Sequence, residues 1–170
     1  MNRGLACAIA LVLGACSSGS PAPERGRPAA KTDLAALVAA VRAAGVHGNE
    51  LQVQPLRDPQ VEDLRTQAGA LEAQGKYKLA AAVLDRALAM TPGDPDLLQW
   101  QAELALYTRA WPDAERLANL SFEKGPRLGG LCRRNWSTIL HARSRRGDIA
   151  GADVARRQVD ACTVAPPVRM

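Results

Sequence analysis

The feature that most constrains the fold is a segment that recurs after 34 residues. Residues 75–95, GKYKLAAAVLDRALAMTPGDP, align at that offset with residues 109–129, RAWPDAERLANLSFEKGPRLG. Ala80 falls on Ala114, and both segments carry a proline near their end. A fixed period of this length is typical of repeat proteins, whose units bury their apolar faces against one another. The sequence therefore predicts a stack of similar units.

The composition predicts that these units are helical. Ala, Leu, Arg and Glu are abundant, aromatic residues make up only 4% of the chain, and strand-like runs of Val, Ile, Thr and Tyr are nearly absent. Asp58-Pro59 and Asp94-Pro95 each place a capping carboxylate before a proline, an arrangement that favours the start of a helix. We therefore expect an all-α fold.

The period, together with the pattern of small and apolar residues, resembles the tetratricopeptide repeat, a family built from pairs of antiparallel helices. The resemblance implies about three helical hairpins that form a short right-handed solenoid over residues 61–165. The expected repeats cover about 61–94, 95–128 and 133–165. The third departs most from the family, because Arg156 stands where an apolar residue is usual.

The resemblance also implies a binding groove. In this family, side chains from the first helix of each repeat line a concave face that binds peptides or partner domains. Carried over by position, the expected groove residues are Arg65, Gly69, Glu72, Gln99, Glu103, Leu106, Tyr107, Arg134, Ser137, His141 and Arg145. Three repeats make only a short groove, and a helix predicted at 33–44 could occupy part of it.

That helix is expected within residues 32–58, ahead of the repeats, and the remainder of this segment is expected to be a loop. Thr32 or Asp33 is the predicted cap, and Gly45 is the predicted stop. One apolar face would be formed by Leu34, Leu37, Val38 and Val41.

The first fifteen residues have the pattern of an export signal peptide. Arg3 supplies a positive charge, residues 4–13 are uncharged and largely apolar, and small residues follow before a cleavage site. The motif LGAC at 13–16 resembles the lipobox of bacterial lipoproteins, in which the cysteine, here Cys16, receives a diacylglycerol and an N-acyl chain. The alternative is an ordinary signal peptide cut after Ala15, which would leave a free thiol.

The location of the protein is expected from the residues that follow Cys16. Residues 16–31 are rich in Ser, Gly, Pro and Ala, and they predict a flexible tether that spans about 20–25 Å on average. Ser17 resembles the sorting pattern of outer-membrane lipoproteins. The apolar run before Cys16 is shorter than the roughly 20 residues of a membrane-spanning helix. We therefore expect a lipid-anchored protein of the outer membrane that faces the periplasm, with a short tail at 166–170.

Two further cysteines are predicted to form a disulfide. Cys7 leaves with the signal peptide and Cys16 is lipidated, so Cys132 and Cys162 remain as an even pair in an oxidising compartment. They lie near the start of the first helix and the end of the second helix of the third repeat. These two ends are neighbours in an antiparallel hairpin. The alternative is a pair of unpaired buried thiols.

No motif in the sequence points to catalysis or to a metal. There is no nucleophile elbow, no Gly-rich phosphate loop, no HExxH, no CxxC and no His/Cys cluster with zinc spacing. We therefore expect a protein that is not an enzyme and that needs no cofactor beyond the lipid on Cys16.

Charge is divided unevenly along the chain. Residues 127–170 hold nine arginines and three aspartates, a net charge of +6, whereas residues 16–126 hold twelve basic and fourteen acidic residues, a net charge of −2. The basic segment is either an ordinary solvated face or a patch for an acidic partner or an anionic envelope polymer. Nucleic acid is not an expected ligand outside the cytoplasm.

Taken together, these features resemble small tetratricopeptide lipoproteins of the Gram-negative outer membrane, and among them the activators of bifunctional penicillin-binding proteins. The resemblance implies a monomeric protein-binding module that docks on a peptidoglycan synthase and stimulates it. The alternatives are a pilotin-like assembly factor for a secretin or another envelope complex, and a general envelope scaffold.

Overall fold

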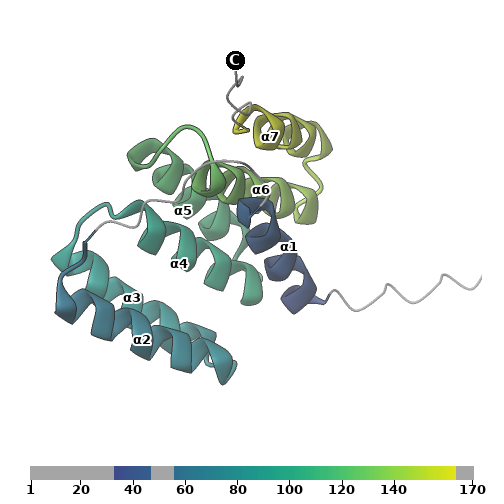
Figure 1. The fold of residues 1–170 in the computed structure, drawn as a ribbon. Helices are drawn as coiled ribbons and strands as arrows, with labels where there is room; N and C mark the ends of the chain where they lie inside the picture. Colours follow the sequence, from purple (N-terminus) through teal and green to yellow (C-terminus); the bar gives the residue numbers. More distant parts are fainter. Residues whose placement is uncertain (1–32, 47–55, 164–170) are drawn as a thin grey trace, which may run out of the picture. The chain divides into compact units, whose positions relative to one another are not determined.

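The computed structural model describes residues 33–46 and 56–163, which form seven α-helices and no strand (Figure 1). The helices are α1 (Leu34–Val46), α2 (Pro59–Ala73), α3 (Tyr77–Met90), α4 (Pro95–Tyr107), α5 (Trp111–Lys124), α6 (Gly130–Arg145) and α7 (Ile149–Ala161). The expectation of an all-α fold is confirmed for this part of the chain. The predicted signal peptide, Cys16, the tether and the tail lie outside the described residues.

The starts of two helices follow the predicted capping pattern. Asp58 accepts a hydrogen bond from the backbone N–H of Gln60 (2.8 Å), and Asp94 accepts one from the backbone N–H of Leu97 (3.0 Å). A proline occupies the first turn of α2 and of α4, where the missing N–H removes no helical hydrogen bond. The local sequence therefore defines where these helices begin.

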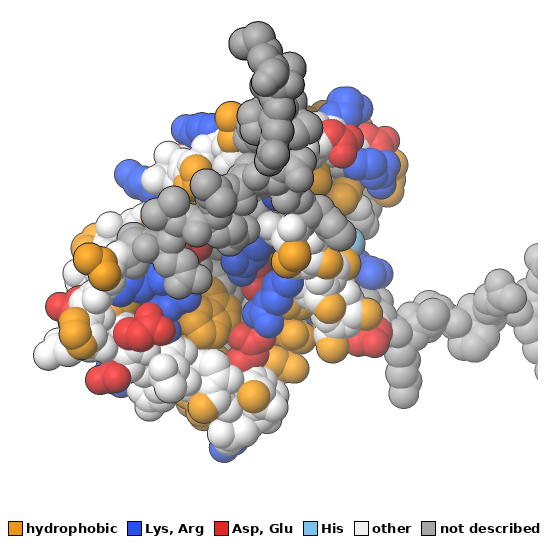
Figure 2. All heavy atoms as spheres, viewed as in Figure 1, with side chains coloured by type: hydrophobic (Ala, Val, Ile, Leu, Met, Phe, Trp, Pro, Cys, Tyr) orange, Lys and Arg blue, Asp and Glu red, His pale blue; other side chains and the backbone are white. Residues whose placement is uncertain are grey.

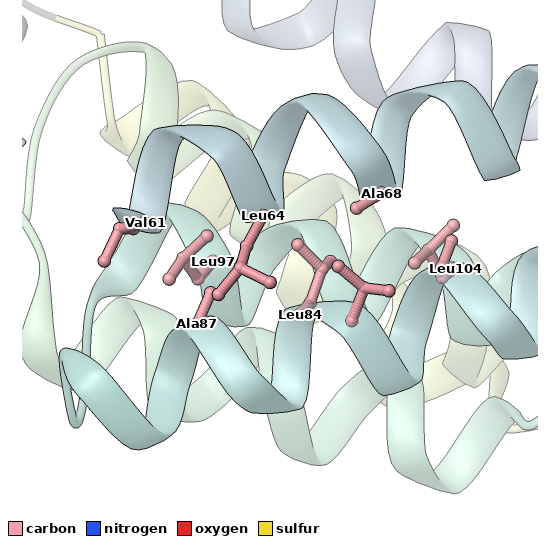
Figure 3. Packing of buried hydrophobic residues seen from close by; sticks show 9 residues of the cluster. Val61, Leu64, Ala68, Leu84, Ala87, Leu97 and Leu104 are labelled. Atoms are coloured by element: carbon pink, nitrogen blue, oxygen red, sulfur yellow. The ribbon is translucent and has the colours of Figure 1, made fainter. Parts of the chain in front are cut away.

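The six helices after α1 form three consecutive hairpins, α2–α3, α4–α5 and α6–α7 (Figure 1). Ala68 and Ala80 have no exposed surface, and their small side chains let α2 and α3 approach closely. In Figure 3, side chains of α2, α3 and α4 point toward one another and form one core: Val61, Leu64, Ala68, Leu84, Ala87, Leu97 and Leu104. The first hairpin is thus packed directly onto the first helix of the second.

The last hairpin is closed at its open end by a covalent bond. Cys132 near the start of α6 and Cys162 after α7 form a disulfide, with an S–S distance of 1.97 Å and a Cα–Cα distance of 5.6 Å. The backbone N–H of Gly129 donates to the carbonyl of Cys162 at 2.7 Å, beside the disulfide. The two ends of this hairpin are therefore joined twice.

Helix α1 lies against α4 and α6, the first helices of the second and third hairpins. Its apolar face of Leu37, Val38 and Val41 is buried against Leu106 and Ala142. None of the described helices combines the length and the apolar character needed to cross a membrane. Helix α1 thus covers part of the surface on which the groove is expected.

The helix does not stop at Gly45, as the sequence suggests, but continues to Val46. Gly45 is buried in the last turn, where an added Cβ would lie 2.6 Å from Cδ of Arg134 and 3.2 Å from the carbonyl oxygen of Gly130. The glycine therefore permits a close approach of α1 to α6.

Candidate functional site

A hollow of about 570 Å³ lies between α1 and α2, with α4 as its floor, and we call it the α1–α2 groove. It brings together six of the residues that the sequence assigns to a groove: Arg65, Gly69, Glu72, Glu103, Tyr107 and Arg134. Arg42, Ala73, Asp96 and Trp100 complete its lining. Figure 2 shows basic and acidic side chains gathered around this hollow.

The deepest charged group of the groove is the carboxylate of Glu103, which has no exposed surface. Oε2 accepts a hydrogen bond from Nε of Arg42 at 2.8 Å, and Oε1 accepts from Nε and Nη2 of Arg134 at 3.0 and 2.5 Å. Burial by itself lowers the pKa of Arg42, but the charges of Glu103 and Glu72 more than offset this and raise it overall. One buried carboxylate on α4 therefore holds α1 and α6 together.

Trp100 is fixed in the groove along its edge and over its face. Its indole Nε1–H donates to Oε2 of Glu72 at 2.6 Å, and the guanidinium of Arg65 lies 5.3 Å from the ring centroid. Oε1 of Glu72 pairs in turn with Nη2 of Arg42 at 2.8 Å. The orientation of the indole is thus set by residues of α1 and α2 before any ligand arrives.

Tyr107 forms the aromatic end of the groove. Its ring stacks on that of Tyr77 from α3, with centroids 4.1 Å apart and an interplanar angle of 3°. Burial raises the pKa of the Tyr107 hydroxyl above its usual value, so this hydroxyl stays protonated. The groove therefore combines charged walls with flat aromatic surfaces.

The five other residues expected in the groove lie elsewhere, because α1 packs along α6 and α4. Gln99 is buried behind Glu103, and its Nε2 donates to Oε1 of Glu103 at 3.0 Å and to Oγ1 of Thr138 at 2.8 Å. Leu106 and Ser137 are buried, and Leu106 packs in the same cluster as the apolar face of α1. His141 and Arg145 also lie outside the groove lining.

Four residues of the lining are absent from the sequence-based expectation, namely Arg42, Ala73, Asp96 and Trp100. Trp100, Glu103 and Tyr107 follow one another at spacings of three and four, so they share one face of a helix, and this pattern could have identified Trp100. Arg42 is the only charged residue of α1, which marks it as a residue with a partner. No local signal indicates that this partner is on α4.

The basic C-terminal repeat uses several of its arginines for internal contacts. Arg133 is buried, and its Nε donates to the carbonyl of Ala44 at 2.9 Å. Arg143 and Arg146 both pair with Glu115 of α5. These arginines therefore join helices, and they contribute less to an exposed basic patch than the sequence suggests.

His141 should make the stability of the fold depend on pH. Burial, and then the charge of Arg145, hold the pKa of His141 below its ordinary value of 6.5. The unfolded state therefore binds more protons than the folded state as the pH falls through this value, so the free energy of unfolding should decrease between about pH 7.5 and pH 5.5. Urea unfolding measures the decrease, and His141→Gln should reduce it. An equal pH dependence in the two proteins would contradict this assignment.

No group of three or more His, Cys, Asp or Glu residues that could hold a metal ion occurs in residues 33–46 and 56–163. The groove itself holds three guanidinium groups and three carboxylates, arranged largely as ion pairs around aromatic rings. Such a surface is suited to recognising another molecule by hydrogen bonding and by stacking.

The comparison with protein families matches residues 61–104 to the tetratricopeptide repeat. The matched stretch covers most of α2, all of α3 and most of α4, and so includes Arg65, Glu72, Trp100 and Glu103 of the groove. No curated protein matches the chain. The matched repeat and the all-α, hairpin-based solenoid together support a tetratricopeptide-repeat protein, a kind of protein that typically serves as a scaffold for protein–protein interactions.

Proposed function

We propose that this chain is a protein-binding module whose partner inserts a segment into the α1–α2 groove. The observation that carries the proposal is Trp100, which lines an open groove with its ring held by Glu72 and Arg65. Tryptophan and arginine are the residues most enriched among those that dominate binding energy at protein interfaces. Because these side chains are already oriented, little conformational entropy is lost when a partner binds.

We further propose that the module is anchored by lipid on Cys16 in the outer membrane, faces the periplasm, and acts as a monomer on a bifunctional penicillin-binding protein. The support for this role is the lipobox-like motif and the resemblance to lipoprotein activators of peptidoglycan synthases. The protein would act without catalysing a reaction, by binding the synthase and stimulating glycan polymerisation and crosslinking. The anchor would confine it to one surface and raise its effective concentration there.

The test is crosslinking of the acylated full-length chain in cells, followed by identification of the proteins that copurify. Recovery of a penicillin-binding protein, together with stimulation of that synthase by the purified chain, supports the proposed role. Recovery of a secretin subunit would replace it with the pilotin-like alternative. A synthase whose activity is unchanged by the purified protein would overturn the activation step.

Trp100→Ala should lower the affinity for the partner by roughly 10- to 100-fold, because it removes the aromatic surface and leaves Glu72 without one donor. Arg116→Ala is a matched control, since Arg116 lies on α5, pairs only loosely with Asp113 at 3.3 Å and is 63% exposed. Isothermal titration with the recovered partner measures both affinities. Equal affinities of the Trp100→Ala and Arg116→Ala variants would show that the partner binds elsewhere.

A further inference from the structure

We infer that one edge of the solenoid binds the surface of an anionic phospholipid bilayer. This edge carries the turn inside each of the three hairpins, and we call it the turn edge, comprising residues 74–78, 108–112 and 146–150. The helices α2, α4 and α6 all end on this side of the molecule (Figure 1). The inference goes beyond the proposed function, because it assigns a partner to a surface outside the α1–α2 groove.

The turn edge is basic, whereas the opposite edge is neutral. The turn edge has a net charge of +3, from four basic residues and one acid: Lys76, Lys78, Arg109, Arg146 and Asp148. The connections between hairpins, residues 91–94 and 125–129, lie on the opposite edge and hold one acid and one base. Of these two edges, only the turn edge therefore carries a net positive charge.

Most of the cations of the turn edge are available to a ligand. Three of them are exposed and form no ion pair within the described part of the chain, namely Lys76, Lys78 and Arg109. The fourth, Arg146, pairs with Glu115. The carboxylate of Asp148 is engaged by its own helix, because it accepts a hydrogen bond from the backbone N–H of Gly151 at 2.8 Å, and Asp33 caps α1 in the same way. The fold therefore leaves the positive charge of this edge largely unneutralised.

Arg109 stands at a backbone position for which the other hairpins use glycine. Their turns have Gly75 (φ 71°) and Gly147 (φ 80°) at this place, and Arg109 has a φ of 59°. A left-handed conformation is unfavourable for a residue with a Cβ, and Arg109 is the one non-glycine residue that adopts it in residues 33–46 and 56–163. Strain of this kind is often retained where a side chain has a function. The exposed cation at this turn is thus favoured over the glycine that would fit the backbone better.

The start of α1 lies at the same edge. The end of α1 meets the start of α6, because an added Cβ at Gly45 would lie 3.2 Å from the carbonyl oxygen of Gly130. Helix α1 thus runs antiparallel to α6, and Leu37 in its first turn shares a cluster with Ala142 near the end of α6. The chain that leads from Cys16 therefore enters the fold at the turn edge. A lipid on Cys16, as in the proposed function, would hold this edge toward the bilayer.

A bilayer surface fits the turn edge better than a small anionic ligand does. Neither the α1–α2 groove nor a second hollow, of about 330 Å³ beside the start of α6, is lined by a residue of the turn edge. Packed helices lie about 8–10 Å apart, so the three turns spread their cations over roughly 20 Å. A continuous anionic surface contacts all of them at once, and each Lys or Arg near it strengthens the binding.

The test measures binding to lipid vesicles by cosedimentation. The protein is residues 16–170 with Cys16→Ser, so that every described helix is present and no lipid is attached. The vesicles consist of phosphatidylcholine alone, or of phosphatidylcholine and phosphatidylglycerol at about 7:3, in about 0.1 M salt. Binding should require phosphatidylglycerol, and it should weaken at least tenfold in about 0.5 M salt, because salt screens exposed charges.

Two triple variants of equal net charge test where the contact lies. The first removes the exposed cations of the turn edge by Lys76→Gln, Lys78→Gln and Arg109→Gly, and it should bind the mixed vesicles at least 20-fold more weakly. The control removes three exposed cations toward the other end of the helices by Arg86→Gln, Lys124→Gln and Arg127→Gln, and it should lose no more than about threefold. The reason is that a helix of 14 residues, such as α3, spans about 21 Å, whereas the Debye length at 0.1 M salt is about 10 Å.

The single variant Arg109→Gly separates a role in binding from a role in folding. Glycine relieves the strain at this turn, so the thermal midpoint should be unchanged or higher, while the affinity for the mixed vesicles should fall about fivefold. In hydrogen exchange, mixed vesicles should protect the amides of the turn edge and leave those of 91–94 and 125–129 unchanged. Circular dichroism establishes that each variant is folded.

Three results would overturn the inference. The first is a failure of the mixed vesicles to bind the protein. The second is an equal loss of binding in the two triple variants, which would indicate attraction by net charge alone. The third is unchanged vesicle binding of the turn-edge variant together with loss of its crosslinking to a protein in cells, which would assign the edge to an acidic protein. None of these results bears on the α1–α2 groove, so the proposed function is decided by its own test.

Discussion

Replacing Glu103 with alanine is expected to lower the free energy of unfolding by about 2–4 kcal/mol, because it leaves the guanidinium groups of Arg42 and Arg134 without their shared carboxylate. Loss of one partner from a fully buried ion pair costs about 3–5 kcal/mol. Glu103 is fully buried, but the side chains of Arg42 and Arg134 are 41% and 27% exposed, so water partly compensates them. Urea unfolding of the full chain measures the change.

Two control variants separate the buried network from ordinary surface charge. Asp113→Ala removes a carboxylate that is 61% exposed and pairs with Arg116 within one helix, so its effect should be about 0–1 kcal/mol. Glu103→Gln keeps the shape of the side chain, so its loss of unfolding free energy should lie between those of Glu103→Ala and Asp113→Ala. Since Arg42 is on α1, the amides of α1 should exchange hydrogen faster in Glu103→Ala than in the parent chain. If Glu103→Ala loses no more unfolding free energy than Asp113→Ala, the structural role of Glu103 is refuted.

Removing the disulfide is the second change with a large expected effect. The bond joins residues separated by 30 positions, so the double variant Cys132→Ala/Cys162→Ala should lose about 2–4 kcal/mol of unfolding free energy through the greater entropy of its unfolded state. The loss should be concentrated in the α6–α7 hairpin, because the bond ties the start of α6 to the end of α7. Hydrogen exchange of α7 amides and urea unfolding measure the local and the global effects.

Reduction provides the matched control for this variant. Dithiothreitol should destabilise the parent chain by a similar amount and should leave the double variant unchanged. Alkylation of the denatured parent chain without reductant should leave the peptides that contain Cys132 and Cys162 unmodified. Modification of both thiols would show that the bond is absent, and the predicted loss of stability would then have no basis.

Much of the fold could be predicted from the sequence because its determinants are local. The Asp-Pro pairs that begin α2 and α4 act within one helical turn, and the small residues at Ala68 and Ala80 recur with the period of the hairpins. Because the pattern recurs every 34 residues, each repeat indicates the same packing of two helices. The helical hairpins were accessible for the same reason, whereas the disulfide was predicted from the even number of cysteines that remains after Cys7 and Cys16 and from the places of Cys132 and Cys162 at neighbouring ends of one hairpin.

The composition of the groove was harder to predict, because it depends on where α1 docks. The hydrogen bond between Arg42 and Glu103 joins residues 61 positions apart, and neither residue identifies the other in the sequence. Once α1 lies on α4 and α6, it buries the region around Leu106 and moves the open groove toward α2. Positions carried over from the repeat pattern could find the residues of α2 and α4, but not the arginine that α1 contributes.

The packing of α1 against α4 and α6 also has a mechanical consequence. Although α1 is the first helix of the described residues, its main contacts are with α4 and α6, in the second and third hairpins. A pull on Asp33 would therefore load Leu37, Val38 and the Arg42–Glu103 ion pair, and it would not unravel the α2–α3 hairpin from its end. Tension would enter the groove through the wall that α1 provides, and it would reach the α2 wall through the ion pair between Arg42 and Glu72.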